Sequence, residues 1–590
     1  MEEDTLSKVK QIWDEASVVS NLMERQWVEN KLLTHSTHIT ARKFGQSNLF
    51  VPMIEKFHYR KQADHFFAYT GDNPVSLKQT LTSSKEGASI MERVVNFYLK
   101  EAGGIDWDAS VLNCAHNALT YNFAPWFVDW DRDTDKVEVD VQGLDKEGNL
   151  VMLKQEKERE LYSYPTLEII SPDDMRIDPS VGWNEIGLAR YGIIRRWRDR
   201  AFAEKMERNG DWPEIPESFF NDKKDLGSQL KKTANETNLG MSSATEGFVE
   251  VWYAYYYNDE GIPVRAVTVE GLMVLEEEAE LEFDTADKDG SDPWPFGAGI
   301  IYAEPHQLYS RAMPQKLKQL QVEKNAIRNQ RRDNVALVLN REKFMTPSAG
   351  IDPATLSRSI PGKVNTVSSR DSVWWDAPPD VTASSYNEET VTTTDAEQLV
   401  SESAQRVGGS GQRKETATVA KIAAANANTA TSLDTGVFGM TFPVRAVKKI
   451  IRMIRQAAPP EIFEAAARDA MISVADPYVE ALTGSFKIKV GNGVQQSARD
   501  IAISQASNTA AIVQSVYGNQ ANFYPIMAPM LEAMGLNPSD IIQDPTAQQP
   551  NQQIQQDAGG QDGQSQIPRQ QVAAVQGGAF GSADQPNQNT

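Results

Sequence analysis

The spacing of apolar residues along the chain predicts several helices. Apolar side chains recur at steps of three and four residues over residues 5–33, 87–98 and 108–121, which places them on one face of a helix. A longer stretch of the same kind covers residues 308–334. Pro314 lies near its start, where a proline either fits the first turn or kinks the helix.

Other stretches have the alternating pattern of strands. Strict alternation predicts a strand at residues 136–142, and a half-buried strand is expected at 164–171. Three more are expected at 248–257, 263–269 and 272–275, joined by turns rich in Asn, Asp and Gly. Helical and strand patterns in one chain indicate an α+β fold. A chain of 590 residues has room for roughly three to five structural units.

The pattern changes in the last 250 or so residues. A small mixed segment at 336–379 precedes a polar helix at about 387–407, which the run Gly408-Gly409-Ser410-Gly411 ends because glycines disfavour helix. An amphipathic helix is expected at 438–458, a strand at 485–490 and further helices at 498–536. The last fifty residues contain 15 Gln and almost no bulky apolar side chains, so we expect them to be disordered.

Composition narrows the functional classes. The 59 basic and 81 acidic residues give a net charge of −22, which argues against a surface that coats DNA generally. No apolar stretch approaches the ~18 residues of a membrane span, and the acidic N-terminus is unlike a signal peptide. Cys114 is the single cysteine, so neither an intrachain disulfide nor a zinc–thiolate site can form.

No catalytic or cofactor site is evident. Gly408–Glu415 is the nearest approach to a phosphate-binding loop, but Arg413 replaces its second glycine and Glu415 its Ser or Thr. The acidic turn Asp131–Asp135 lacks the glycine and glutamate of a calcium loop. The histidines are isolated or lack further metal ligands nearby, as for His35 and His38. We therefore expect a protein that is not an enzyme and has no cofactor or metal.

Two helices carry unusual positive charge. The helix around residues 315–334 has a net charge of +4 in an otherwise acidic protein. In the helix at 438–458, a row of five cations opposes an aliphatic face: Arg445, Lys448, Lys449, Arg452 and Arg455. A solvated surface helix is the simplest interpretation. A phosphate-facing stripe or a helix bound to anionic lipid are the functional alternatives.

The order of these segments resembles the portal protein of tailed bacteriophages. Residues 45–52 (GQSNLFVP) resemble the family's entry into the body of the subunit, and residues 171–179 (SPDDMRIDP) resemble a strand exit of that family. Residues 319–334 (QLQVEKNAIRNQRRDN) resemble its first stem helix, and Glu415-Thr-Ala-Thr418 resembles the segment after the second. The succession of segments over about residues 40–540 supports the resemblance more than any one motif does.

The resemblance implies a ring, usually a dodecamer, built from wing, stem, clip and crown. Its regions would be the following: wing 1–306 and 436–497; stem helices 307–335 and 385–407; an α/β clip 336–384; a tunnel loop and following helix 408–435; a crown 498–540; and a disordered tail 541–590. Nothing matches the helical barrel that some members add after the crown. The tunnel loop would place Gly408, Gly409, Gly411, Arg413 and Lys414 beside the channel, and Trp374 and Trp375 would contact partners at the clip.

The implied function is a ring at one capsid vertex through which the genome is packaged and ejected. It implies as partners double-stranded DNA without sequence preference, the terminase, head–tail adaptor and tail proteins, and the major capsid and scaffolding proteins. Such a protein would be found in virions and, during assembly, in the host cytoplasm. Another oligomeric virion protein, such as a tail adaptor or minor capsid protein, and a peripheral membrane or scaffold protein remain the alternatives.

Overall fold

The computed structural model describes the part of the chain that precedes residue 492, with gaps. The described residues are 2–38, 46–144, 150–221, 247–286, 291–339, 343–347, 349–354, 364, 366–375, 382–400 and 433–491. The expected tunnel loop, crown and tail all lie outside these residues.

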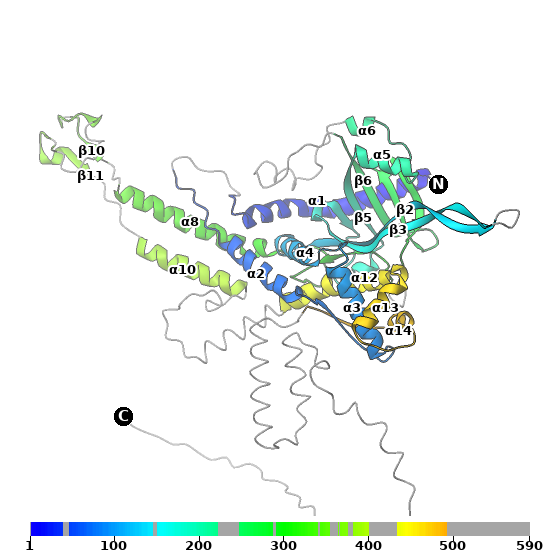
Figure 1. Cartoon of the computed structure of the whole chain (residues 1–590). Coiled ribbons are helices and arrows are strands. Elements are labelled where there is room, and N and C mark those ends of the chain that lie inside the picture. Colours follow the sequence, from blue (N-terminus) through cyan, green and yellow to red (C-terminus); the bar gives the residue numbers. More distant parts are fainter. Residues whose placement is uncertain are drawn as a thin grey trace, which may run out of the picture. The chain divides into compact units, whose positions relative to one another are not determined.

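Helices and strands are both abundant, which confirms the mixed α+β class (Figure 1). The helices are α1 (Glu2–Thr34), α2 (Met53–Tyr69), α3 (Lys85–Lys100), α4 (Trp107–Tyr121), α5 (Arg200–Asn209), α6 (Ser218–Asn221), α8 (Met313–Leu339), α10 (Thr382–Leu399), α12 (Pro443–Ala457), α13 (Pro460–Asp469) and α14 (Pro477–Leu482). The strands are β1 (Val75–Lys78), β2 (Ala124–Leu144), β3 (Leu150–Ile169), β4 (Met175–Ile177), β5 (Tyr191–Asp199), β6 (Phe248–Tyr257), β7 (Pro263–Val269), β8 (Met273–Glu280), β9 (Phe296–Gly299), β10 (Lys343–Met345), β11 (Val373–Trp375) and β12 (Lys487–Val490).

Local sequence accounts for where several helices begin. Ser84, Asp106 and Asp199 precede α3, α4 and α5, and each side chain accepts a hydrogen bond from a backbone N–H of the first turn. Pro314 is the second residue of α8, so it fits the first turn, where a missing N–H costs no helical hydrogen bond. Of the two alternatives for this proline, the first is therefore confirmed.

The largest sheet is antiparallel, with strand order β4-β5-β6-β7-β8. Helix α1 packs on it through Trp13, whose ring stacks on that of Trp252 in β6 at 4.3 Å between centroids. The long strands β2 and β3 form a second antiparallel sheet together with β9. The predicted strand at 136–142 is thus one part of the much longer β2.

The main hydrophobic core joins segments that are far apart in the sequence. It contains side chains of α2, α3 and α4 together with α12 and α13. Trp107 of α4 stacks on Phe442 just before α12, and β1 pairs with β12 from Val75↔Val490 to Lys78↔Lys487. Residues 433–491 therefore return to the part of the fold that begins the chain.

Helices α8 and α10 are joined through a small separate unit. Strands β10 and β11 pair antiparallel between them, from Lys343↔Trp375 to Met345↔Val373. The helices pack side by side and antiparallel (Figure 1). Helix α8 extends four residues beyond the predicted end at 335, and α10 begins three residues before the expected 385.

Candidate functional site

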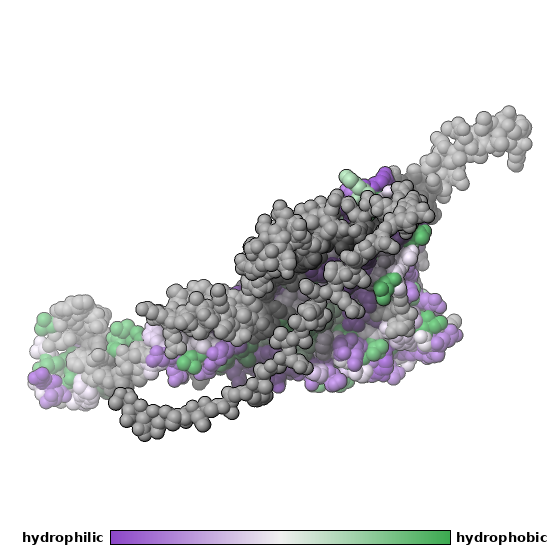
Figure 2. All heavy atoms as spheres, turned by 90° about the horizontal axis from the view of Figure 1, so that it is seen from below, coloured by the Kyte–Doolittle hydropathy of each residue, from purple (hydrophilic) through white to green (hydrophobic). Residues whose placement is uncertain are grey.

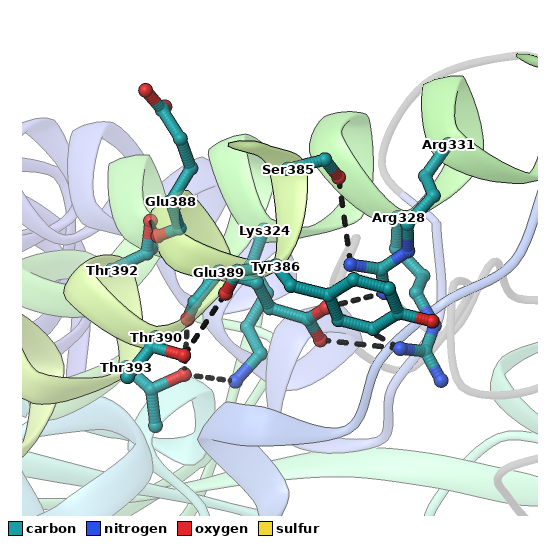
Figure 3. Close-up of polar contacts among 10 residues, drawn as sticks. All are labelled: Lys324, Arg328, Arg331, Ser385, Tyr386, Glu388, Glu389, Thr390, Thr392 and Thr393. Carbon is teal, nitrogen blue, oxygen red and sulfur yellow. Dashed lines mark hydrogen bonds and ion pairs between the residues drawn. The ribbon is translucent and has the colours of Figure 1, made fainter. Parts of the chain in front are cut away.

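Helices α8 and α10 are held together largely by polar contacts. Glu389 of α10 forms ion pairs with Arg331 and Arg328 of α8, the latter at 3.3 Å (Figure 3). One turn away, the Lys324 ammonium donates a hydrogen bond to Thr393 Oγ1 at 2.6 Å. Arg331 also lies over the ring of Tyr386, 4.0 Å from its centroid. These residues are three or four positions apart on each helix, so they share one face.

The charges of the two helices are complementary. Helix α8 carries six Lys and Arg against two acidic residues, a net charge of +4, whereas α10 carries four acidic residues and no basic ones. Burial alone would raise the pKa of Glu389, but the hydrogen bond and charge of Arg331, with Arg328 and Lys324, lower it. Burial lowers the pKa of Lys324, which Glu389 partly opposes. Glu389 is thus the centre of the contact.

An extended segment lies along another side of α8. Its backbone N–H groups at Ser47, Leu49 and Val51 donate to side-chain oxygens of α8 at distances of 2.7–2.9 Å. The acceptors are Asp333, Asn329 and Asn325, in that order. A fourth member, Gln321, accepts from Ile54 N and donates to Val51 O. We call the set Gln321, Asn325, Asn329 and Asp333 the polar ladder.

The spacing of the polar ladder along α8 nearly equals the spacing of every second N–H group in an extended chain. Four residues of helix rise about 6 Å, and two residues of extended chain span about 6.6 Å. Every second N–H of the segment therefore meets a side chain four positions further along the helix. The two stretches that resembled portal sequences, 45–52 and 319–334, are brought together by these bonds. Polar residues at every fourth position were the signal for this contact, which sequence reasoning missed.

Replacement of Gln321 by Ala should destabilise the folded protein by about 2 kcal/mol, because Val51 O and Ile54 N lose their buried partner. Urea unfolding followed by tryptophan fluorescence measures this, and hydrogen exchange should show faster exchange at Ile54. Gln330→Ala is the matched control, since Gln330 lies exposed on the same helix. Equal losses in the two variants would contradict a role for the polar ladder.

The five cations of α12 lie in a different environment from the one expected. Lys449 is fully buried and forms an ion pair with Asp292 at 3.0 Å, and burial lowers its pKa to about 8. Arg445 pairs with the same carboxylate at 3.1 Å. Arg452 donates to Thr285 O and Arg455 to Gly484 O, while Lys448 is half-buried. The interpretation of this row as a solvated face is therefore wrong for Lys449, because its ammonium lies against Thr285 O and the Asp292 carboxylate.

The aromatic residues of the β10–β11 unit are partly exposed. Trp374 is 49% exposed and stacks on Phe344, which is 40% exposed, with ring centroids 5.7 Å apart. The β10–β11 unit lies at the left of Figure 2, where apolar residues are visible at the surface. The backbone of Trp375 pairs with Lys343. Gly408, Gly409, Gly411, Arg413 and Lys414 lie outside the described residues.

Histidines inside the fold are not arranged as a metal site. Within the described residues, no group of three or more His, Cys, Asp or Glu could hold a metal ion. His58 is buried, with its ring 4.7 Å from that of His116, and shares a 3.0 Å hydrogen bond with Thr120. His65 is fully buried against Phe438. Burial lowers the pKa of His58 and of His65 to about 3 and that of His116 to about 4.

The comparison with protein families decides the identity. The family model described as the phage SU10 portal protein matches residues 154–574, which include α8, α10 and the unit between them. The chain belongs to this portal protein family. Among curated proteins, none matches the chain. The resemblance found in the sequence is therefore confirmed.

Portal family membership sets the general role. The protein is a structural, non-enzymatic component of the virion with a role in the capsid portal. The family implies an oligomeric ring and passage of DNA. In the part of the chain that the structure describes, no helix has the length and apolar character needed to cross a membrane.

Proposed function

We propose that this chain forms the ring at one capsid vertex whose channel carries double-stranded DNA during packaging and ejection. The match to the portal family over residues 154–574 carries this proposal. The ring is usually a dodecamer in the family that the sequence resembles. The net charge of −22 suits a conduit, because a channel that bound phosphates strongly would hold the DNA instead of letting it slide.

The observed elements support an assignment of regions. The α8–α10 hairpin is the stem and the β10–β11 unit between its helices is the clip. The wing combines the sheets and helices before α8 with α12, α13, α14 and β12, which share its core. By their order in the sequence alone, residues 498–540 are assigned to the crown and residues 541–590 to the tail, and both lie outside the described residues.

We place docking of the terminase and of head–tail adaptor proteins at the clip. Exposed aromatic pairs are unusual on a surface without a partner, and Trp is enriched where protein interfaces gain most of their free energy. Trp374→Ala should leave rings intact but weaken adaptor binding at least tenfold, which surface plasmon resonance with purified rings measures. Tyr59→Ala, which changes an exposed aromatic residue of α2 outside both the clip and the stem, is the control. Unchanged adaptor affinity for Trp374→Ala would move docking elsewhere.

We place a weak DNA contact at the tunnel loop. Arg413 and Lys414 follow three glycines within four residues, and such cations contact phosphates reversibly and without sequence preference. The double variant Arg413→Ala, Lys414→Ala should assemble normally but reduce the amount of DNA in filled heads. Normal DNA content with normal infectivity would reject this contact and leave the glycines as chain geometry.

Electron microscopy of the purified, negatively stained protein tests the proposal as a whole. We expect closed rings with a central channel wide enough for duplex DNA. Labelling of one vertex in intact virions by an antibody against the protein places the ring. Monomers, or rings found only in the tail of the virus particle, would contradict the proposal and favour another virion component. Binding of the protein to anionic vesicles would favour a membrane-associated role instead.

A further inference from the structure

The two broad faces of the α8–α10 hairpin carry opposite charge at the same level. Arg331 and Glu389 pair between the helices, so both point into the hairpin. Arg332 comes directly after Arg331, and Glu388 comes directly before Glu389. Successive residues of a helix point about 100° apart, so the Arg332 and Glu388 side chains point away from the contact between the helices. Because α8 and α10 run antiparallel, the residue after Arg331 and the residue before Glu389 lie on opposite faces of the helix pair. Glu388 indeed points away from the polar cluster in Figure 3.

Each face also exposes apolar side chains around its charge. The Arg332 face includes Val335 and Leu339 of α8, which are 40% and 75% exposed, and Tyr386 of α10. The Glu388 face consists of one stripe on α10 at steps of three and four residues: Glu388, Val391, Asp395 and Leu399. Val391 and Leu399 are 59% and 52% exposed.

No residue that the structure describes neutralises the charge on the two faces. Arg332, Glu388 and Asp395 are all exposed, and none forms an ion pair with another described residue. Glu323 of α8 adds another exposed acidic group on the Glu388 side. At the level of the Arg331–Glu389 pair, one face is thus acidic and the other basic, each with apolar residues beside the charge.

We propose that the Glu388 face of one copy packs against the Arg332 face of a second copy, with Arg332 and Glu388 paired across the contact. Two different surfaces on opposite sides of one subunit give a head-to-tail contact, which closes into a ring when the rotation between copies allows it. Arg332 and Glu388 each lie about 1.5 Å along their helix axis from the Arg331–Glu389 pair. Two neighbouring copies placed at the same height therefore bring Arg332 of one next to Glu388 of the other. This inference rests on the proposed ring and names the surfaces that build it.

Charge reversal tests the contact. Glu388→Arg places two cations at every contact, and Arg332→Glu places two anions there. We expect each single variant to lower the ring fraction at least tenfold at low salt, measured by size-exclusion chromatography with light scattering. The double variant carries both changes and should restore rings. Co-expression of the two single variants should also restore rings, with subunits that alternate. Glu207→Arg on the exposed side of α5 has the same charge change as Glu388→Arg and serves as the control.

The outcomes separate this contact from the ring itself. Rings from the wild type and from both single variants would overturn the Arg332–Glu388 pair while leaving the portal function intact. Loss of rings in the double variant as well would also overturn it, because the two changes then act independently. Far-ultraviolet circular dichroism and the unfolding midpoint of each variant establish that the subunits are folded. Absence of rings in the wild type would refute the proposed function instead.

Discussion

Replacement of Asp292 by Asn is expected to destabilise the folded protein by about 3 kcal/mol, because it leaves the buried Lys449 ammonium without a counter-charge. Lys449 is 0% exposed, and its other contacts are the backbone oxygens of Thr285 and Asp292. Asn fits the site in other respects, since it has nearly the same shape and tolerates the positive φ of 56° at this position. Urea unfolding of the full chain measures the loss.

Two further variants separate the lost charge from a general effect of mutation at this site. Lys449→Met removes the cation but keeps an apolar chain of similar length, so the double variant with Asp292→Asn should recover much of the lost stability. Asp469→Asn breaks the exposed ion pair with Arg93 and should cost less than about 1 kcal/mol. A double variant no more stable than Asp292→Asn would show that the unpaired charge of Lys449 is not the cause and would assign the loss to the broken pair of Asp292 with Arg445.

Lys449 also shows why burial could not be predicted from the helix pattern alone. The 3.6-residue period places Lys449 in a row with Arg445 and Arg452, opposite the aliphatic residues of α12. The period gives the relative direction of side chains but does not identify which elements cover each face. Thr285 and Asp292 supply that cover, from more than 150 residues earlier in the chain. Because Thr285 and Asp292 accept hydrogen bonds from its ammonium, Lys449 is buried although the helix pattern suggests an exposed side chain.

Elements with a strong local signal were predicted well. Helices α1, α3 and α4 and strands β6 and β7 have continuous periodicity, and their observed bounds lie within about three residues of those expected. Helix α2 was missed because its apolar residues do not gather on one side: it buries His58, Lys61 and His65 along with Phe57. A helix that buries polar groups gives no clean stripe, so its pattern could not be distinguished from a loop.

The candidate site also has features that the sequence predicted and features that it did not. The unusual charge of the first stem helix was visible in the sequence, and the structure places Arg328 and Arg331 against α10. Their partner Glu389 was not predicted, because pairing depends on how two helices about 50 residues apart are aligned. The polar ladder depends on an extended segment almost 300 residues away. Only the tertiary fold specifies these two alignments.

Two buried histidines, His58 and His65, and the half-buried His116 lead to an expected loss of stability in mild acid. His58, His65 and His116 have pKa values of about 3, 3 and 4 in the folded chain, against about 6.5 when unfolded. Above pH 6.5 they are neutral in both states and do not change the free energy of unfolding. Below it, the unfolded chain binds protons that the folded chain does not, so unfolding becomes easier. Each histidine then lowers the free energy of unfolding by up to about 1.4 kcal/mol per pH unit, until the pH reaches its folded pKa.

His65 allows this effect to be isolated. Its ring nitrogens have no hydrogen-bond partner among the described residues, and burial beside Phe438 is the main reason for its low pKa, with the charge of Lys61 adding to it. His65→Leu therefore loses no hydrogen bond and removes one titrating group. Between pH 6.5 and 5, the stability of this variant in urea unfolding should fall less steeply than that of the wild type, by up to about 1.4 kcal/mol per pH unit. Between pH 7.5 and 8.5 the two curves should run parallel, because the histidine is neutral in both states. Parallel curves in the acid range as well would show that His65 does not carry the acid sensitivity, and the loss would then fall to the paired rings of His58 and His116.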